Sequence, residues 1–332
     1  MEPVIQKILV VGGNGFLGSA VCRAALARGM RVTSISSSGR PYTTPKGHSP
    51  AWTSKIEWRT GDALQPESYA HLLPGVTAVV HTTGTLFADT RYKNALKDGN
   101  VPALLGTLVS NLTASGSSAN PLEKRDAPGE YERLNRDAAL RVCETFLASP
   151  PSVPVNGPRP FIFVSAEDAT RPFISARYIE TKREAELGIE NMTKGRPDYR
   201  AVYIRPSMMY HPHFRPVTSP IAALLDLSAT IHSKAPSGFP TPSSVLRSLA
   251  SAFPAASSDP SPLVGPSPLD SIANALTIPP IHVDHVAEAI CIAVDQARPD
   301  VKGVVGVKEM RDLIGWSSKG QQQSSVRAQP HP

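Results

Sequence analysis

The chain has 332 residues, enough for one large domain or two modest ones, and 41% of them are hydrophobic, which is ordinary for a globular protein. No run of eighteen apolar residues is present, so we expect no transmembrane helix. The formal charge of +6 comes without a long Lys/Arg run or an aromatic-basic stripe, and this disfavours nucleic acid as a partner.

Apolar runs typical of buried strands alternate with helical periodicity along the first 205 residues. The predicted strands are 7–11, 31–36, 56–60, 78–81, 161–164 and 200–204, and the predicted helices are 19–28, 131–147 and 174–192. This alternation predicts an α/β fold, a Rossmann-like doubly wound parallel sheet in a dinucleotide-binding domain over residues 1–205. Residues 84–130 read as a polar insertion into that domain.

The pattern degrades from residue 206 to residue 280, which is rich in Ser, Pro and Ala. We interpret this stretch either as a small C-terminal substrate lobe or as a variable insertion. Order returns with a strand at 281–283, a helix at 284–297 and a last strand at 303–307, so residues 281–315 are predicted to rejoin the main domain. The tail 316–332 is predicted to be disordered.

Three cysteines, Cys22, Cys143 and Cys291, lie far apart, and each falls in an apolar stretch. Their odd number and wide spacing argue for a reducing compartment and against a disulfide framework or a zinc site. The first predicted strand begins near residue 7, so we expect neither a signal peptide nor a long transit peptide ahead of it.

A glycine-rich turn joins the first predicted strand to the first predicted helix. Its spacing matches G-x-G-x-x-G, and a pyrophosphate fits such a turn because free N–H groups and the helix dipole favour an anion there. The alternative is a glycine turn without a ligand, but the strand-turn-helix context favours nucleotide binding. The predicted cofactor residues are Gly12, Gly13, Asn14, Gly15, Phe16, Leu17 and Gly18.

The end of the second strand bears on the choice between NAD and NADP. NAD-binding domains often carry an acidic residue there, which binds the ribose hydroxyls. Here no acidic residue lies between Glu2 and Glu57, and the strand ends at Ser36, four residues before Arg40. We expect Ser36 and Arg40 to contact the cofactor, with Arg40 pairing a 2′-phosphate, so NADP is favoured over NAD. The alternative is that Arg40 is a solvated loop residue.

Three further residues form a candidate catalytic set. Ser165 ends a predicted strand, and Tyr178 and Lys182 are four residues apart on a predicted helix, so they share one face. A neighbouring ammonium lowers the pKa of a phenol and makes it a usable general acid or base near neutrality. A Y-x-x-x-K spacing is common by chance, and the alternative is a surface helix with a partly buried Tyr. The glycine turn upstream, the strand that ends in Ser165 and the spacing between Ser165 and Tyr178 favour the catalytic interpretation.

With these motifs the chain resembles the short-chain dehydrogenase/reductase superfamily, in its extended or atypical, epimerase/dehydratase-like branch. The matching motifs span a little over half of the chain. The resemblance implies a nicotinamide dinucleotide cofactor and either oxidoreductase or epimerase/dehydratase chemistry. It also implies further cofactor contacts at Asp62 for the adenine, at His81, Thr82 and Thr83 after the fourth strand, and at Lys182 and Arg205. Asn135, Tyr210 and the block 281–289 match other family positions.

Within the family, the glycine turn and the "RYIETKREAE" helix resemble two mitochondrial groups. One is associated with coenzyme Q (ubiquinone) biosynthesis in fungi, and the other comprises nucleotide-binding accessory subunits of respiratory complex I. The first resemblance implies a mitochondrial matrix location, peripheral association with an inner-membrane complex and a quinone-precursor or lipid-like substrate. The second implies a non-catalytic scaffold subunit. A cytoplasmic location is the alternative.

Several histidines invite a metal interpretation. His282 and His285 flank Asp284, but no Cys or Glu lies at ligand spacing, so we expect no metal site. His211 and His213 are interpreted as loop histidines. Asp284 is predicted to be a helix N-cap.

Overall fold

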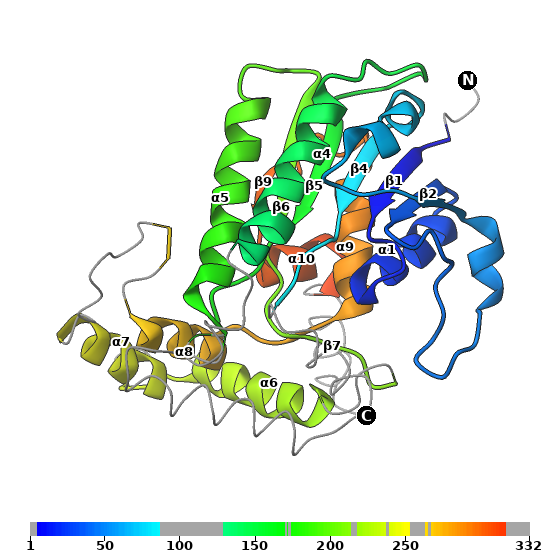
Figure 1. Ribbon diagram of the computed structural model, residues 1–332. Coiled ribbons are helices and arrows are strands. Elements are labelled where there is room, and N and C mark those ends of the chain that lie inside the picture. Colours follow the sequence, from blue (N-terminus) through cyan, green and yellow to red (C-terminus); the bar gives the residue numbers. More distant parts are fainter. Residues whose placement is uncertain are drawn as a thin grey trace, which may run out of the picture.

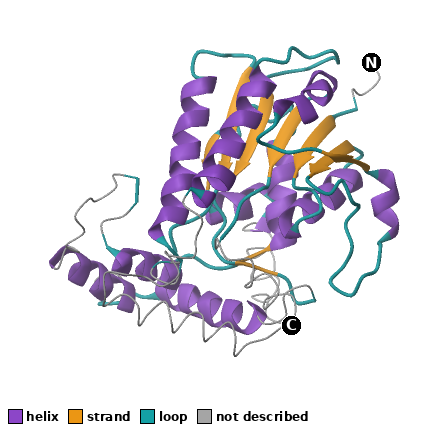
Figure 2. Cartoon of the chain, viewed as in Figure 1, coloured by secondary structure: helices purple, strands orange, loops and turns teal. Residues whose placement is uncertain are grey.

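The computed structural model describes residues 5–86, 129–169, 171, 174–213, 218–236, 239–252, 263–264 and 267–316. Within these ranges the chain forms a seven-stranded sheet with helices on both faces and a small two-stranded sheet (Figure 1, Figure 2). The strands of the large sheet are β1 Lys7–Val11, β2 Arg31–Ser36, β3 Glu57–Thr60, β4 Ala78–His81, β5 Arg159–Val164, β6 Tyr199–Ile204 and β9 Gly303–Val305.

The large sheet is parallel throughout, in the order β3-β2-β1-β4-β5-β6-β9. The chain first builds outward from β1 to β3 and then crosses back to place β4 on the other side of β1. This is the doubly wound arrangement, and the predicted fold class is confirmed. Its topological switch point, where such folds bind ligands, lies between the carboxyl ends of β1 and β4.

Both faces of the sheet are covered, which explains the uninterrupted apolar run in β1. Ile8 and Val10 pack in one core cluster with residues of α1 and α9, whereas Leu9 and Val11 pack in a second cluster with residues of α4 and α5. These helices are α1 Phe16–Ala27, α4 Ala138–Leu147, α5 Ala176–Thr193 and α9 Val283–Ala293. Short 3-10 helices cover 51–55, 66–68 and 70–75, and α10 spans Val307–Leu313.

The predicted strands at 7–11, 31–36 and 78–81 have the observed bounds, whereas some helices differ at their starts. The helix α1 begins at Phe16, three residues before its predicted start, because Gly15 is its N-cap. The helix predicted at 131–147 consists of a π-helical turn, Glu132–Asp137, followed by α4. Most of the predicted polar insertion, 87–128, and the tail from residue 317 lie outside the described residues.

The stretch after β6 contains three helices, α6 Thr218–Lys234, α7 Pro242–Ala252 and α8 Pro268–Thr277. Figure 1 shows them beyond the carboxyl ends of the large sheet, where α6 and α7 both pack against α8. Their buried residues are mostly small, such as Ala222, Ala250 and Ala273, so the sequence shows little apolar periodicity there. The proposed domain boundaries at residues 205 and 280 stay a prediction.

Two short strands, β7 Met209–Tyr210 and β8 Ile281–His282, pair in parallel and bring the two ends of this stretch together. The prediction of Asp284 as the N-cap of the following helix is wrong, because α9 begins at Val283 and its N-cap is His282. The Nδ1 atom of His282 accepts a hydrogen bond of 3.2 Å from the Asp284 backbone N–H. No helix within the described ranges combines the length and apolar character that crossing a membrane requires.

Candidate functional site

The parallel register gathers the predicted site residues along one edge of the sheet. Val11 lies opposite Ile35 on one side and opposite His81 on the other, and Phe163 lies opposite both His81 and Tyr203. The glycine turn, the segments after β2, β3 and β4, and the residues Ser165 and Arg205 therefore all follow the carboxyl ends of neighbouring strands. Only the sheet order brings these six segments together.

The glycine turn has two kinds of glycine. Gly12 has a φ of +86°, where a side chain is disfavoured, and a Cβ on Gly18 would lie 2.2 Å from the Gly12 carbonyl oxygen. A Cβ on Gly13 would lie 2.3 Å from the Ser34 hydroxyl. At Gly15, by contrast, the Gly12 oxygen at 3.2 Å is the only atom of the described residues within 4 Å of such a Cβ. Gly12, Gly13 and Gly18 are thus required by internal packing, whereas Gly15 leaves open space at the start of α1.

The segment after β2 adds polar groups beside this turn. The Asn14 side chain donates to the Ser38 hydroxyl at 3.2 Å, and the Ser36 hydroxyl accepts from the Gly39 backbone N–H at 3.2 Å. Arg40 is exposed, and its backbone N–H donates to Ser38 at 3.3 Å. The guanidinium of Arg40 is therefore accessible close to the glycine turn.

After β3, Asp62 is half-buried and its Oδ1 accepts a hydrogen bond from the Leu64 backbone N–H at 3.0 Å. After β4, the Thr82 hydroxyl donates to the Val11 carbonyl at 2.8 Å. The Thr82 and Thr83 hydroxyls would each lie 3.0 Å from a Cβ on Gly12, so both flank the first glycine of the turn.

His81 is fully buried, with its ring 5.9 Å from the ring of Phe163. Burial and the nearby positive charge of Lys182 lower the pKa of His81 to about 3, so the ring is neutral. Neither ring nitrogen has a hydrogen-bond partner among the described residues. A buried ring offers no side-chain surface to a cofactor, and contact by this residue would come from its backbone.

Lys182 lies at the centre of the candidate site. Its Nζ donates to the Val164 carbonyl at 2.9 Å, and the side chain is buried. A Cβ on Gly84 would lie 2.8 Å from this Nζ and 2.9 Å from the Asn135 Oδ1, so these three residues form one tight cluster. Burial lowers the pKa of Lys182 to about 7, although the carboxylate of Glu186 opposes the shift. The ammonium can therefore lose a proton near neutral pH.

The π-helical turn Glu132–Asp137 presents Asn135 to this cluster. The Asn135 side chain accepts from the Thr85 N–H at 2.8 Å and donates to the Thr85 carbonyl at 3.1 Å. Single π-helical turns often occur at functional sites. The sequence pattern did not reveal this turn, because apolar spacing alone does not distinguish a π turn from an α turn.

Tyr178 lies in the first turn of α5, one helical turn before Lys182, and is half-buried. The start of α5 is held by Arg177, whose guanidinium bonds to Glu132 at 2.6 Å, Glu180 at 3.1 Å and Glu184 at 2.8 Å. This network, which the sequence analysis missed, ties α5 to the π-helical turn. Tyr178 and Asn135 are thus carried by two elements that are joined by ion pairs.

Ser165 takes part in a second ionic network. Its hydroxyl lies 3.1 Å from the Arg183 Nη1, which donates to it and also to Glu186 at 2.7 Å. Arg205 makes a two-pronged ion pair with Glu186, with one contact at 3.0 Å. Burial opposes ionisation of Glu186, but these bonds outweigh it and hold the pKa of Glu186 below its ordinary value. Arg205 is engaged by this carboxylate.

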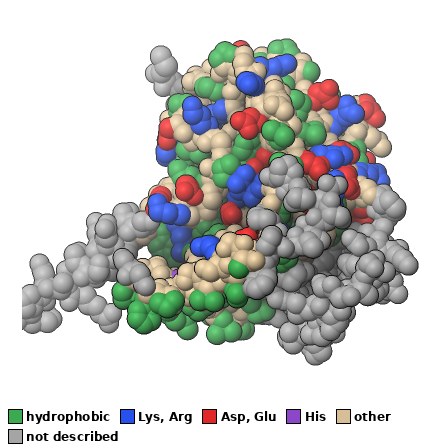
Figure 3. Space-filling view, turned by 90° about the vertical axis from the view of Figure 1, so that its left-hand side faces the viewer, with side chains coloured by type: hydrophobic (Ala, Val, Ile, Leu, Met, Phe, Trp, Pro, Cys, Tyr) green, Lys and Arg blue, Asp and Glu red, His purple; other side chains and the backbone are tan. Residues whose placement is uncertain are grey.

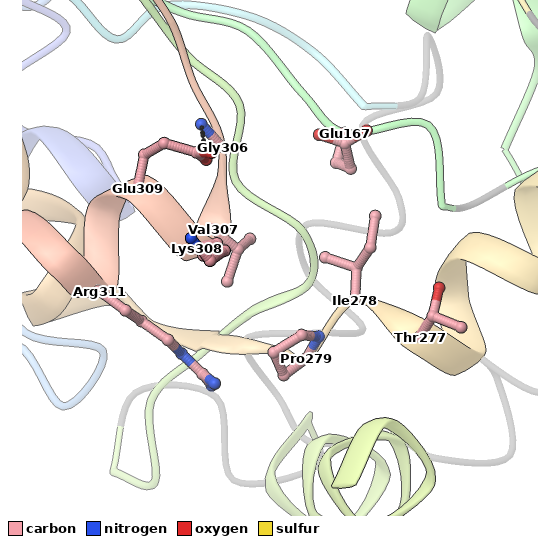
Figure 4. Close-up of a pocket in the computed structure, with 9 residues that line it drawn as sticks. All are labelled: Glu167, Thr277, Ile278, Pro279, Gly306, Val307, Lys308, Glu309 and Arg311. Atoms are coloured by element: carbon pink, nitrogen blue, oxygen red, sulfur yellow. Dashed lines mark hydrogen bonds between the residues drawn. The ribbon is translucent and has the colours of Figure 1, made fainter. Parts of the chain in front are cut away.

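A pocket of about 500 Å3 is lined by Glu167, which follows Ser165 by two positions in the sequence (Figure 4). Glu167 faces it from the loop after β5, with its backbone N–H bonded to the Pro206 carbonyl at 2.9 Å. Its apolar lining comes from Ile278, Pro279 and Val307. Burial raises the pKa of Glu167, even though Arg183 and Arg205 act against the shift. The sequence analysis did not single out Glu167.

A relative from Saccharomyces cerevisiae, MIOREX complex component 2, is 33% identical over 215 residues, which cover 63% of this chain and 75% of that protein. The model of the "NAD dependent epimerase/dehydratase family" matches residues 8–104. The chain belongs to the NAD dependent epimerase/dehydratase family. This finding confirms the family resemblance and the dinucleotide-binding character of the fold.

Solved structures agree with the fold of this epimerase/dehydratase family member. A 3-oxoacyl-[acyl-carrier protein] reductase from Brucella melitensis, determined in complex with NAD, has a TM-score of 0.53 at 10% identity and covers 92% of this chain and 96% of that one. A short-chain dehydrogenase/reductase of the glucose/ribitol dehydrogenase type from the same organism has a TM-score of 0.51 at 13% identity, covering 91% and 94%. At these identities the likeness shows the fold alone.

Proposed function

We propose that this chain is an NAD(P)-dependent oxidoreductase that uses Ser165, Tyr178 and Lys182, with NADP(H) as the preferred cofactor. The observation that carries the proposal is the environment of Lys182. Its ammonium is buried at the carboxyl edge of the sheet, close to Asn135, and it lies one helical turn after Tyr178. Strongly perturbed pKa values of buried groups cluster at functional sites, which supports this assignment.

The proposed roles follow from this geometry. The dinucleotide supplies or accepts the hydride. Tyr178 donates a proton to the substrate oxygen as a carbonyl is reduced, or removes it as an alcohol is oxidised. Lys182 binds the ribose hydroxyls and lowers the pKa of Tyr178 by its charge. Ser165 orients the substrate oxygen, and Arg183 holds that hydroxyl in place.

The cofactor preference rests on the segment after β2. The exposed guanidinium of Arg40 suits a 2′-phosphate, and no acidic side chain between Glu2 and Glu57 would repel one. Replacing Arg40 with alanine should weaken NADPH binding and leave NADH binding unchanged. Equal losses for both dinucleotides would contradict the assignment.

For the substrate, we propose a quinone-precursor or similarly lipid-like molecule held in the pocket beside Glu167. The apolar lining by Ile278, Pro279 and Val307 suits a ring or an isoprenoid chain. The resemblance to the coenzyme Q-associated group supports a role in ubiquinone biosynthesis, in the mitochondrial matrix and peripheral to the inner membrane. On this proposal residues 206–280 form the substrate-side lobe.

The test is consumption of NADPH by purified protein with quinone-ring and isoprenoid-phenol substrates. A thermal-shift panel of NADPH, NADH and nucleotide-sugars, run beside it, distinguishes redox from epimerase or dehydratase chemistry, because ligands that bind the folded state raise its melting temperature. Stabilisation by nucleotide-sugars with no NADPH consumption would overturn the oxidoreductase proposal.

The second candidate is a non-catalytic nucleotide-binding subunit of a mitochondrial membrane complex. Two observations favour it. The yeast relative is named as a complex component. In addition, exposed apolar side chains gather on α6 and α7, along the lower part of the molecule in Figure 3. These side chains are Ile221, Leu224, Leu227, Ile231, Val245 and Leu249.

Comigration on native gels distinguishes the two candidates. For a scaffold, wild-type protein should migrate with a large membrane complex, the Tyr178→Phe variant should do so equally well, and neither should consume NADPH. Charged replacements of Leu224 and Leu227, which are 69% and 57% exposed, should release the protein from the complex without unfolding it. Turnover by wild-type protein that is lost in Tyr178→Phe would favour the enzyme instead.

A further inference from the structure

Two pairs of histidines, far from each other in the sequence, gather where the two-stranded sheet meets α9. His211 and His213 follow β7, whereas His282 ends β8 and His285 lies in the first turn of α9. The ring centroids of His211 and His282 are 4.9 Å apart, and those of His282 and His285 are 5.6 Å apart. The parallel pairing of Tyr210 with His282 produces this convergence.

Within this cluster, His211, His282 and Asp284 each offer one ligand atom, and these atoms all lie within 4.8 Å of one another. Two ligands bound to a tetrahedral zinc ion at 2.0–2.2 Å are about 3.4 Å apart. The His282 Nδ1 and the Asp284 Oδ2 are 3.9 Å apart, so closing the site requires small side-chain movements. Two imidazoles and a carboxylate favour a divalent transition metal over Mg2+ or Ca2+.

The carboxylate is also oriented for this role. Arg23 in α1 holds the Oδ1 of Asp284 at 2.5 Å, which leaves Oδ2 as the oxygen directed at His282. Carboxylates that bind metals are typically held in this way by a second partner, which fixes their orientation. His211 is buried, while His282 and Asp284 keep 20% and 39% of their side chains exposed. Two of the three candidate ligands, His282 and Asp284, are therefore reachable from solvent.

Binding at Nδ1 would replace a backbone hydrogen bond at each of the two histidines. The Nδ1 of His211 accepts from the His213 backbone N–H at 3.1 Å, and the Nδ1 of His282 accepts from that of Asp284 at 3.2 Å. Both N···N distances are long for hydrogen bonds. A metal–imidazole bond is far stronger than either of these hydrogen bonds. A metal bound at Nδ1 would need the lone pair that now accepts each N–H, so these contacts would break and the rings would turn toward the ion on binding.

We propose that His211, His282 and Asp284 form a binding site for a divalent transition-metal ion of the zinc type. The fourth position is open to water or to a neighbouring side chain. The bound ion would join the turn after β7 to the start of α9, and through Arg23 it would be coupled to α1. Its expected role is to fasten the segment after β6 to the main sheet. The sequence predicted no metal here, because no Cys or Glu lies at ligand spacing around His282 and His285, and His211 lies 71 positions before His282.

The test is calorimetric titration of ZnCl2 into full-length protein that has been stripped with a chelator and dialysed. We expect one saturable site with a dissociation constant in the micromolar range or tighter, and an increase in melting temperature on adding Zn2+. His211→Ala, His282→Ala and Asp284→Asn should each weaken Zn2+ binding by about tenfold or more. His71→Ala, an exposed histidine in another part of the chain, is the matched control and should bind as wild type does.

Substitution with Co2+ provides a second measurement, because a Co2+ ion held by imidazoles in a protein absorbs visible light. The absorption should appear with wild-type protein and be lost in His282→Ala. Should an alanine variant fail to fold, Asp284→Asn keeps the shape of the side chain and still removes the anionic ligand. The proposal is overturned if wild-type protein shows no saturable Zn2+ heat, or if folded variants bind Zn2+ with unchanged affinity. Neither outcome depends on dinucleotide binding or turnover.

Discussion

Alanine replacements at Gly15 and Gly18 separate ligand binding from internal packing in the glycine turn. A Cβ on Gly18 would lie 2.2 Å from the Gly12 oxygen and 2.8 Å from the Gly13 Cα. The first distance is roughly 1 Å shorter than an ordinary contact, and backbone atoms cannot rotate away from it. Overpacking of this kind lowers the free energy of unfolding by ~1–3 kcal/mol. The better helix propensity of alanine offsets roughly 1 kcal/mol of this loss.

For Gly18→Ala the clash is with backbone atoms, so we take the upper end of that range, ~3 kcal/mol, and expect the free energy of unfolding to fall by about 2 kcal/mol once the gain in helix propensity is subtracted. The melting temperature should fall by about 2–4 °C per kcal/mol. For Gly15→Ala the nearest atom is the Gly12 oxygen at 3.2 Å, so the stability loss should stay below about 1 kcal/mol. NADPH affinity should nevertheless fall at least tenfold, about 1.4 kcal/mol, because the new methyl group occupies the space that the pyrophosphate needs.

The assays are urea unfolding for stability and titration calorimetry for NADPH affinity. Gly75→Ala is the matched control, since a Cβ there meets no atom within 4 Å in the part of the chain that the structure describes. A Gly15→Ala protein with wild-type NADPH affinity would refute the ligand role of the turn. A Gly18→Ala protein as stable as Gly75→Ala would refute the packing argument.

Four other substitutions test the rest of the site. Tyr178→Phe should abolish turnover and leave the calorimetric affinity for NADPH intact, and retained activity would contradict its role. The Lys182→Met protein should be more stable than wild type below pH 7, and this difference should disappear as the pH rises toward 10.5. The reason is that burial lowers the pKa of Lys182 to about 7 in the folded protein, below its unfolded value. Protonation of Lys182 therefore favours the unfolded chain. Unfolding free energies measured at pH 6 and pH 9 check this. Glu186→Gln leaves the half-buried guanidinium of Arg205 without its carboxylate partner and should lower the unfolding free energy by ~1–3 kcal/mol, which thermal and urea unfolding would detect. Arg40→Ala should weaken NADPH but not NADH in parallel titrations.

The sequence predicted those features that depend on the residues of one short segment. The strands at 7–11, 31–36 and 78–81 were predicted with their observed bounds, because strands buried on both faces are continuously apolar. The glycine turn was readable because its G-x-G-x-x-G spacing lies within one short segment, although Gly12 and Gly13 also contact the distant residues Thr82, Thr83 and Ser34.

Other features depend on partners that are distant in sequence. The carboxylate of Glu186 pairs with Arg183 in its own helix and with Arg205 after the next strand, and helical spacing predicts only the first of these contacts. Helices α6, α7 and α8 were not predicted, because small residues bury well in close helix contacts but leave weak periodicity.

The sequence by itself therefore determined the parallel α/β architecture and the residues that follow each strand, since apolar periodicity and turn chemistry act over a few residues. Only the tertiary structure decided which of those segments meet. It placed β4 beside β1, buried Lys182 against β5 and brought His211 to His282. The physical reason is that strand order and side-chain burial arise from packing between distant segments, which no local pattern encodes.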